Sequence, residues 1–480
     1  VYGYLYAIQE ELGTLTLRLT YYQIDSEECL ELERAVTCDE LRTFFEDLLD
    51  RYLDWARTLW SWTSRRDAAL AALAFPFEAF RPGQRRMAVN IYRRIRDGGH
   101  VMIEAPTGIG KTMGTLFPAA KALGEGHVEK IFYLTARTTG RLTAQAAAEA
   151  LNSRESCLKT LVLTAKEKIC AFPEAACTPE ECPYAQGHYD RLNAALGDLF
   201  ALDVVAAEEI SAGAERHRVC PFELSLDLAL WVDCIVCDYN YLFDPRVRLR
   251  RFFEEGGGNH AFLVDEAHNL VDRARDMFSA TLSKKAVLSL RREVKSDQPA
   301  LFKTLGRINA WMLAARKRCD ASGGAHAEDS APEEIYPHLR DFHRRSEAIL
   351  SENKTAPYNE VLLEQYFAVH RFLRVAEQFD EAYRTCYRQM GRDLELRLFC
   401  LDPARQLGET LENCRSAAFF SATLRPEDYY RHLLGLPEGT PVVTLPSPCP
   451  PEHLGVFVDS GVSTHYRDRS QTSTAVAEGI

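Results

Sequence analysis

The chain has 480 residues, of which 46% are hydrophobic and 26% are charged. This composition is typical of globular proteins and excludes disordered, collagen-like and small disulfide-stapled chains. No apolar run approaches the roughly 20 residues that span a membrane, and no signal peptide opens the chain, so we expect a cytoplasmic protein with no membrane partner. The net charge of −12 counts only weakly against a nucleic-acid partner, because local charge decides such contacts.

The first 75 residues form a block of their own. Val1–Ala7 has the pattern of the middle of an apolar helix, Leu15–Ile24 alternates like a strand, and apolar positions over Leu41–Ala56 follow one helix face. Thr37 and Glu40 have the spacing of a capping box. Because the chain lacks an initial Met and ends inside a predicted helix, we expect it to be a fragment.

From about Phe77 onward, short apolar strands alternate with helices such as the one predicted over Gln84–Asp97. The predicted strands are His100–Glu104, Ile131–Leu134, Thr160–Leu163, Cys234–Cys237, Phe262–Val264 and Ala417–Phe420. This alternation favours an α/β fold with a parallel sheet and helices on both faces. Two insertions interrupt it, at 165–225 and 275–395; the second is expected to be largely helical, with one helical pattern over Val361–Met390.

A glycine-containing loop follows the first of these strands and precedes an apolar helix. It reads Ala105, Pro106, Thr107, Gly108, Ile109, Gly110, Lys111 and Thr112, a Walker A element with Ala at its first glycine position. Small residues let backbone N–H groups surround phosphates at a helix N-terminus. Lys111 is predicted to reach the β- and γ-phosphates of ATP, and Thr112 to ligate Mg²⁺. Taken alone, such a run can also be an ordinary turn.

An acidic box ends a later strand. Asp265 is predicted to hold Mg²⁺ and Glu266 to orient and deprotonate the attacking water, with His268 as a further candidate catalytic residue. In isolation the box could be a solvated strand end. Its occurrence after a Walker A element, in the expected order, makes ATP hydrolysis the firmest prediction from the residues.

Three further motifs surround these two. Gln84 could bind the adenine edge with two hydrogen bonds, or could simply begin a helix. Arg137, with neighbouring threonine hydroxyls, could contact a phosphate backbone. Ser421-Ala422-Thr423 ends the last strand and could couple the nucleotide site to a moving partner domain, although either of these strand ends could also be ordinary.

Four of the 14 cysteines cluster in the first insertion. They are Cys170, Cys177, Cys182 and Cys220, with the spacing C-x6-C-x4-C-x37-C. Four thiolates can hold zinc or a four-iron cluster, and this spacing matches neither the common zinc-ribbon nor the ferredoxin pattern. The spacing therefore leaves the metal open, and unligated thiols remain an alternative.

As a set, these elements resemble the iron–sulfur helicases of superfamily 2, the XPD and DinG group. The resemblance covers residues 77–480, and its elements follow the order of that family. The residues that carry it are Glu104–Thr112, the four cysteines, Val219–Glu223, Cys237–Pro245, Val264–Leu270 and Phe419–Leu424. It implies a RecA-like P-loop NTPase domain with a cysteine-rich iron–sulfur insertion and a helical Arch insertion. It favours a [4Fe–4S] cluster over zinc, and implies 5′→3′ translocation on single-stranded DNA with ATP and Mg²⁺.

The resemblance also implies a domain plan. It gives an accessory or nuclease-like tail (1–75), motor domain 1 (76–164, 226–274 and 394–445), the iron–sulfur domain (165–225), the Arch (275–393) and the start of motor domain 2 (446–480). The second RecA-like domain is largely missing, and with it the arginine-bearing motif that completes the ATP site. We therefore expect this chain to bind ATP weakly and not to unwind DNA. Residues 1–75 resemble the end of a RecB- or Cas4-like nuclease domain, or form a plain helical extension.

Contacts with DNA are predicted from aromatic and basic residues. Tyr239, Tyr241 and Arg246 join Arg137 as candidates, because single-strand binding combines stacking with a basic groove. Arginines of the Arch, which could equally form a solvated face, come second: Arg371, Arg374, Arg384 and Arg388. We expect the partners to be single-stranded DNA and DNA junctions or duplex. We also expect the protein to be a monomer and to act in repair or replication stress. The motor part of a helicase–nuclease and an ATP-switched nucleic-acid clamp are the competing hypotheses, and RNA in place of DNA stays open.

Overall fold

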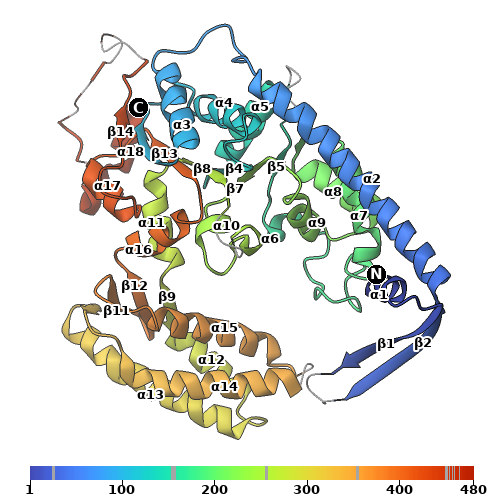
Figure 1. Ribbon diagram of the computed structural model, residues 1–480. Helices are drawn as coiled ribbons and strands as arrows, with labels where there is room; N and C mark the ends of the chain where they lie inside the picture. Colours follow the sequence, from blue (N-terminus) through green and yellow to red (C-terminus); the bar gives the residue numbers. More distant parts are fainter. Residues whose placement is uncertain are drawn as a thin grey trace.

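The computed structural model describes residues 1–23, 28–152, 158–253, 258–352 and 356–448, together with parts of 452–479. Its centre is an eight-stranded parallel sheet in the order β14-β3-β13-β8-β4-β7-β5-β6 (Figure 1). The strands are β3 (Gly99–Glu104), β4 (Lys130–Leu134), β5 (Thr160–Val162), β6 (Val204–Val205), β7 (Cys234–Cys237), β8 (His260–Asp265), β13 (Ser416–Ser421) and β14 (Val442–Thr444). All six predicted strands are confirmed, and β6 and β14 are additional.

Both faces of this sheet are covered, because alternate residues of each strand enter two different cores. Val101 and Ile103 of β3 lie in a core with α3 (Gln84–Asp97), α4 (Lys111–Gly124) and α5 (Thr138–Asn152). Met102, between them, belongs to the core on the other face. That face is covered by α10 (Asn240–Phe243), α11 (His268–Met277) and α16 (Ala404–Leu411), with α17 (Glu427–Leu433) packed on α11. The predicted α/β architecture is therefore confirmed.

The first insertion is helical and loop-rich. It contains α6 (Lys166–Ile169), α7 (His188–Phe200), α8 (Ala207–His217) and α9 (Pro221–Leu228), with a turn-rich segment between α6 and α7. Leu196, Leu199, Ile210 and Leu224 join these helices to the core of the parallel sheet. The insertion therefore packs directly on the sheet.

The second insertion combines helices with a small sheet (Figure 1). Its helices are α12 (Lys284–Glu293), α13 (Pro299–Ala321), α14 (Tyr336–Glu352) and α15 (Asn359–Ala376). A four-stranded antiparallel sheet has the order β10-β11-β12-β9, formed by β9 (Ala280–Ser283), β10 (Ala325–Glu328), β11 (Tyr383–Met390) and β12 (Asp393–Cys400). Strand β12 continues to Cys400, past the predicted boundary at 393.

The predicted helical pattern over 361–390 is wrong after residue 376, for nearly half of its length. Helix α15 ends at Ala376, and 383–390 form β11, paired with β12 so that Tyr387 faces Leu396. Tyr383, Thr385 and Tyr387 are buried while the residues between them are more exposed, a period of two. Tyr383 and Tyr387 also fit a helical spacing of four, which is why the pattern misleads.

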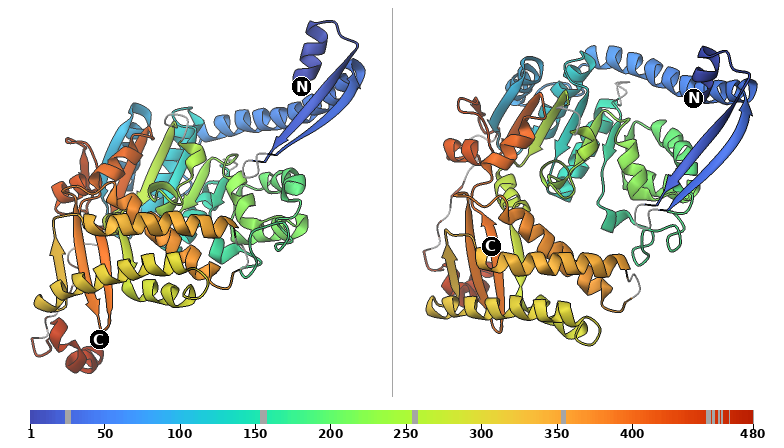
Figure 2. Two further views of the ribbon diagram at one scale, coloured as in Figure 1. Left: turned by 90° about the horizontal axis from the view of Figure 1, so that it is seen from below. Right: turned by 60° about the horizontal axis from the view of Figure 1, so that its bottom comes forward.

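The N-terminal block projects away from the sheet. After α1 (Tyr2–Gln9), strands β1 (Thr14–Tyr22) and β2 (Cys29–Thr37) form an antiparallel pair, and α2 (Cys38–Ala71) runs along the main body (Figure 2). The predicted capping box is present, since Thr37 Oγ1 accepts from the Glu40 N–H at 3.1 Å and the Glu40 carboxylate accepts from the Thr37 N–H at 2.8 Å. Strand β2 was not among the predictions.

Helix α2 is anchored at its C-terminal end. Arg66 Nη1 lies 2.5 Å from Oδ1 of Asp233, which is only 2% exposed. Leu70 packs closely against Gly124 of α4, because a Cβ added to Gly124 would lie only 2.4 Å from the Cβ of Leu70. No helix among the described residues is both long enough and apolar enough to cross a membrane. The predicted entry to a second motor domain falls partly on residues outside the described ones, 449–451, 453–454, 457 and 459; α18 (Arg469–Gly479) follows it.

Candidate functional site

Four neighbouring strands bring the sequence motifs to one edge of the parallel sheet. Ser421 pairs with Glu104, so the end of β13 lies beside the start of the phosphate loop. Asp265 at the end of β8 lies beside Phe420 on one side, and Leu134 of β4 lies beside Val264 on the other. Because all four strands are parallel, the loops that follow them emerge together at their carboxyl ends.

The phosphate loop adopts the conformation that a Walker A element requires. Gly108 and Gly110 have φ values of +82° and +78°, in the left-handed region that favours glycine, and α4 begins at Lys111. The first N–H groups of α4 lack partners within the helix, as at any helix start, and face the region where phosphates would bind. This geometry makes an ordinary turn the poorer interpretation of the loop.

Gln84 holds the phosphate loop from behind. It is 3% exposed; its Nε2 donates to the Gly110 carbonyl at 3.0 Å, and its Oε1 accepts from the Arg81 N–H at 3.0 Å. Arg81 Nη1 in turn donates to the Gly108 carbonyl at 2.7 Å. A side-chain amide offers two N–H groups and two lone pairs, so one of each remains for adenine. Recognition of adenine by Gln84 stays a prediction, whereas its support of the loop is a structural finding.

A connected set of side chains joins the loop to the acidic box and to β13. Lys111 Nζ lies 2.8 Å from Glu266 Oε1, and Ser421 Oγ donates to Glu266 Oε2 at 3.0 Å. His268 Nδ1 lies 2.6 Å from Ser421 Oγ. Burial opposes the ionisation of Glu266, but the bonds from Lys111 and Ser421 outweigh it, so the pKa of Glu266 is lowered. The ionised Glu266 therefore links three of the predicted motifs.

Asp265 is held by two tyrosines, one of which had no predicted role. The Tyr133 hydroxyl lies 3.2 Å from Asp265 Oδ2 and 3.5 Å from Thr112 Oγ1, between the two groups predicted to hold Mg²⁺. The Tyr239 hydroxyl donates to the main-chain carbonyls of Asp265 and Glu266. Burial, followed by the charge of Glu266, raises the pKa of Asp265 to about 6. A tyrosine inside the apolar run of β4 was the only sequence signal for Tyr133.

Glu266 itself has a left-handed backbone, with φ of +47°. Such a conformation costs a non-glycine residue of order 1–3 kcal/mol and tends to occur at functional sites. Here it follows the buried Asp265, whose Oδ1 accepts from the Glu266 N–H at 2.9 Å. The turn therefore aims two successive carboxylates at the same edge.

A cavity of about 190 Å³ opens in front of this edge. Its lining includes Thr112, Arg137, Asp265, Glu266 and Asn269. Arg137 is exposed, so its guanidinium is accessible to an anion. The Asn269 amide nitrogen is buried and makes no hydrogen bond within the described residues, which leaves a donor beside the carboxylates. The cavity therefore combines metal-ligating oxygens with donors for phosphate.

The predicted DNA contacts divide into two groups. Tyr239 is fully buried and holds the acidic box, so the prediction that it stacks on a base is wrong: neither ring face is open. Tyr241 is half-buried and Arg246 half-exposed, and both line a cavity of about 740 Å³. Arg246 pairs through two nitrogens with the buried Asp244. These two residues are therefore accessible where Tyr239 is not.

The 740 Å³ cavity is strongly basic. Its cationic residues are Arg141, Lys166, Lys168, Arg246, Arg248, Arg250 and Arg251, against the acidic Glu167 and Asp238. It lies between α6 and α9 of the first insertion and the segment after β7. Among the second-choice arginines, Arg371 donates to the Asp276 carbonyl at 2.8 Å, and Arg384 and Arg388 lie on β11 instead of a helix. The cavity is thus the stronger candidate for a nucleic-acid path.

The four clustered cysteines are free thiols in the first insertion. Cys170 ends α6 and Cys220 precedes α9. The pKa of Lys166 is raised, first by a hydrogen bond to Cys177 and then by the nearby thiols of Cys177, Cys170 and Cys220. Within the described residues no group of three His, Cys, Asp or Glu side chains is spaced to hold a metal. The donor set nevertheless fits a four-thiolate site in its chemistry, because none of the four cysteines is in a disulfide. Three of them lie at the end of α6 or in the turn-rich segment that follows it, and Cys220 lies at the start of α9.

Burial raises the pKa of the Cys220 thiol, while the backbone N–H groups of Phe222 and Glu223 favour its thiolate. Such N–H groups at the start of a helix stabilise sulfur that carries negative charge. This arrangement suits a ligand of a metal or cluster and adds to the chemical fit of the set.

Comparisons with known proteins agree with this geometry. The DEAD_2 family model matches residues 130–287. The Drosophila yakuba protein "Regulator of telomere elongation helicase 1 homolog" is 25% identical over 257 residues, covering 41% of this chain and 25% of the relative. The human "Regulator of telomere elongation helicase 1" is 26% identical over 264 residues, covering 44% and 21%. The chain thus matches about a quarter of the length of these relatives.

A solved structure described as "XPD_Helicase" has a TM-score of 0.51 and 15% identity, covering 77% of this chain and 62% of its own. At this identity the likeness concerns the fold alone. The family model supplies the independent sequence evidence, because its match contains the acidic box and the segment after β7. In the order of its motifs, in the DEAD_2 match over residues 130–287 and in its fold, the chain is similar to the XPD-like helicases of superfamily 2.

Proposed function

We propose that the chain is the motor portion of an ATP-dependent DNA helicase that moves 5′→3′ on single-stranded DNA and carries a [4Fe–4S] cluster. The observation that carries the proposal is the contact between Lys111 and Glu266, beside Asp265, at the carboxyl edge of the sheet. This is the arrangement that ATP hydrolysis needs: a lysine for phosphate, a buried carboxylate for Mg²⁺ and a second carboxylate for water. Repair or replication stress is the proposed context, with single-stranded DNA and junctions or duplex as partners.

ATP binding is expected to change the partner of Lys111. In the present arrangement its ammonium group is paired with Glu266. A phosphate at the loop would attract Lys111 away from Glu266 and leave that carboxylate with Ser421. Before ATP binds, Lys111 and Ser421 lower the pKa of Glu266 and keep it ionised. With Lys111 on the phosphate, the carboxylate is free on that side to accept a proton from the attacking water. Thr112 and Asp265 are the residues that would hold Mg²⁺, which supplies charge stabilisation to the phosphates.

Ser421 connects this step to the rest of the molecule. Its hydroxyl contacts Glu266 and His268, and the next residues lead to Arg425, whose guanidinium lies 2.9 Å from Glu104 before the phosphate loop. A change in the position of Glu266 is thus communicated to the segment that leaves β13. This is the physical basis for proposing that Ser421-Ala422-Thr423 couples ATP turnover to a partner domain.

Cys170, Cys177, Cys182 and Cys220 are proposed to hold the cluster, which would organise the loop between α6 and α7. The basic cavity that lies against this insertion is the proposed path for single-stranded DNA, with Tyr241 as its aromatic contact and Arg246 as a phosphate contact. Arg137 is proposed to bind phosphate closer to the ATP site. Monomeric state, a nuclease-like N-terminal neighbour and a cytoplasmic location stay predictions.

The test is ATP hydrolysis by the full chain, purified anaerobically, with and without single-stranded DNA. Lys111→Ala is expected to abolish ATP binding, whereas Glu266→Gln keeps binding and lowers turnover by about 10²–10⁴-fold. Glu409→Gln, the same change at an exposed position on α16, is the matched control and leaves turnover unchanged. Equal turnover by the Glu266 and Glu409 variants would exclude the proposed mechanism.

Metal analysis of the same preparation tests the cluster separately. About four irons per chain, lost together in a Cys220→Ser variant, support the [4Fe–4S] assignment. Zinc, or no metal, removes the cluster from the proposal and leaves the ATPase site standing. Turnover that responds to DNA without strand separation by a longer chain favours the clamp hypothesis over the helicase.

A further inference from the structure

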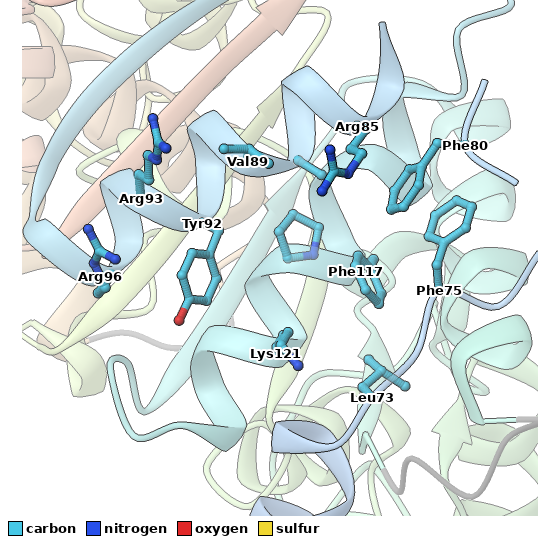
Figure 3. Close-up of a pocket in the computed structure, with 12 residues that line it drawn as sticks. Leu73, Phe75, Phe80, Arg85, Val89, Tyr92, Arg93, Arg96, Phe117 and Lys121 are labelled. Atoms are coloured by element: carbon cyan, nitrogen blue, oxygen red, sulfur yellow. The ribbon is translucent and has the colours of Figure 1, made fainter. Parts of the chain in front are cut away.

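A separate pocket lies on the outer side of α3 and α4, away from the motifs described above. Its volume is about 390 Å³, in the range of ligand pockets, and it has no lining residue in common with the cavity at the phosphate loop. Leu73, Phe75 and Phe80 from the segment that connects α2 to α3 line one side, and Phe117 of α4 lines another (Figure 3). We call it the aromatic slot.

The aromatic rings of the slot are packed against one another. Phe75 and Phe80 are stacked with centroids 3.8 Å apart, and Phe117 meets Phe75 edge-on at 5.4 Å. Each of these rings is half-buried, so the slot retains apolar surface that its own residues do not cover. Because Phe75 and Phe80 cover one face of each other, the slot is better suited to one inserted side chain than to a run of stacked bases.

The rim of the slot is basic and lacks carboxylates. Arg85, Arg93 and Arg96 of α3 and Lys121 of α4 line it, and Figure 3 shows Arg85 near the phenylalanines and Arg93 and Arg96 further along α3. Arg96 is paired with Asp97, and Lys121 donates to the Ala71 carbonyl at 2.7 Å. Neither Arg85 nor Arg93 has a hydrogen bond or an ion pair with another described residue. Arg93 acts on Asp97 through its charge alone, without a direct ion pair. Two cations without a direct ion pair, on a chain of net charge −12, favour an anionic partner.

The spacing of these two arginines limits the shape of that partner. Residues eight positions apart in a helix are separated by about 12 Å along its axis. An extended peptide advances about 3.3 Å per residue, so carboxylates three or four residues apart would match the two guanidinium groups. The phenylalanines lie at the Arg85 end of this span, so an apolar anchor next to the first carboxylate would lie over them.

We propose that the aromatic slot binds an acidic peptide segment of a partner protein, with one aromatic side chain packed against the open surface of Phe80 and Phe117 and two carboxylates on Arg85 and Arg93. The segment would contact both α3 and the connector from α2, and so hold the N-terminal block against the motor. The proposal concerns binding alone and does not depend on ATP hydrolysis.

The experiment measures fluorescence anisotropy of a labelled 12-residue peptide on titration with the full chain. The peptide carries two acidic residues four positions apart and one Phe next to the first of them. We expect saturable binding that weakens as salt is added. We also expect it to weaken at least tenfold when the Phe is replaced by Ala, or when Arg85→Glu and Arg93→Glu are combined in the protein.

The matched control combines Arg86→Glu and Arg94→Glu, which make the same charge change on the same helix outside the slot. It is expected to bind the peptide as the unchanged chain does. Equal loss in both double variants would overturn the proposal, because it would mean that only net charge matters. Absence of saturable peptide binding up to millimolar concentration would also overturn it. So would a labelled single-stranded DNA that binds tighter than the peptide and loses affinity only in the Arg85 and Arg93 variant.

Discussion

Replacing Asp265 with Asn is expected to make the nucleotide-free chain more stable at pH 8. The pKa of Asp265 is about 6, compared with an ordinary value of 3.8, because the carboxylate is buried beside Glu266. Since the native pKa is higher than the unfolded one, the native state binds the proton more tightly, and stability falls as pH rises through this window. The difference of about two units corresponds to about 3 kcal/mol of unfolding free energy once both states are ionised.

The neutral amide should fit without losing hydrogen bonds. The Glu266 N–H, which donates to Asp265 Oδ1 at 2.9 Å, can donate to the amide oxygen instead. The Tyr133 hydroxyl, which lies 3.2 Å from Oδ2, can accept from the amide N–H and donate to Thr112 Oγ1. The gain is therefore expected to stay near 3 kcal/mol at pH 8 and to fall to about half of that at pH 5, where the buried carboxyl is mostly protonated.

The assay is urea unfolding of both chains at pH 5 and pH 8, without nucleotide or Mg²⁺. Asp54→Asn is the control, because Asp54 is 80% exposed on α2 and its replacement should change stability little at either pH. The Asp265 variant should also lose ATP turnover, since it lacks the Mg²⁺ ligand. A variant that is less stable than the unchanged chain at pH 8, or whose advantage does not depend on pH, would refute the reasoning.

Three further changes test separate contacts. Gly110→Ala places a side chain at φ +78°, which costs about 1–2 kcal/mol. The affinity for ATP, measured by calorimetry, should therefore fall about tenfold, and an unchanged affinity would contradict the loop geometry. Arg66→Ala leaves the buried Asp233 without its partner and should lower the free energy of unfolding by about 3–5 kcal/mol, which thermal unfolding can check. Tyr133→Phe removes a donor to Asp265 worth about 1.5–3 kcal/mol, so the Mg²⁺ concentration for half-maximal turnover should rise about tenfold while the KM for ATP changes little.

The nucleotide site could be predicted from sequence because its parts are local. Each motif directly follows an apolar strand, and parallel strands deliver their loops to one edge whatever their order in the sheet. Predicting the Walker A loop and the acidic box therefore did not require knowledge of which strands are neighbours. What the sequence did not reveal is that β13 lies between β3 and β8, the placement that puts Ser421 on Glu266.

Residues whose role depends on burial were harder to predict. Tyr239 has the same sequence character as an exposed stacking tyrosine, and only the contacts of its hydroxyl with the carbonyls of Asp265 and Glu266 show that it faces inward. Strand β11 fits both a helical and a two-residue period, and its pairing with β12 decides between them. Tyr133 gave no signal except a hydroxyl in an apolar strand. In each case a contact between distant segments determines the outcome.

At the phosphate site, the ion pair between Lys111 and Glu266 competes with the contact that Lys111 would make with ATP. Lys111 is neutralised by Glu266, and the Glu266 turn has a left-handed backbone. Asp265 is buried with a raised pKa, which makes its charge costly until a cation arrives. ATP with Mg²⁺ must therefore break one ion pair before it gains the phosphate contact, while the charge at Asp265 is compensated only on binding.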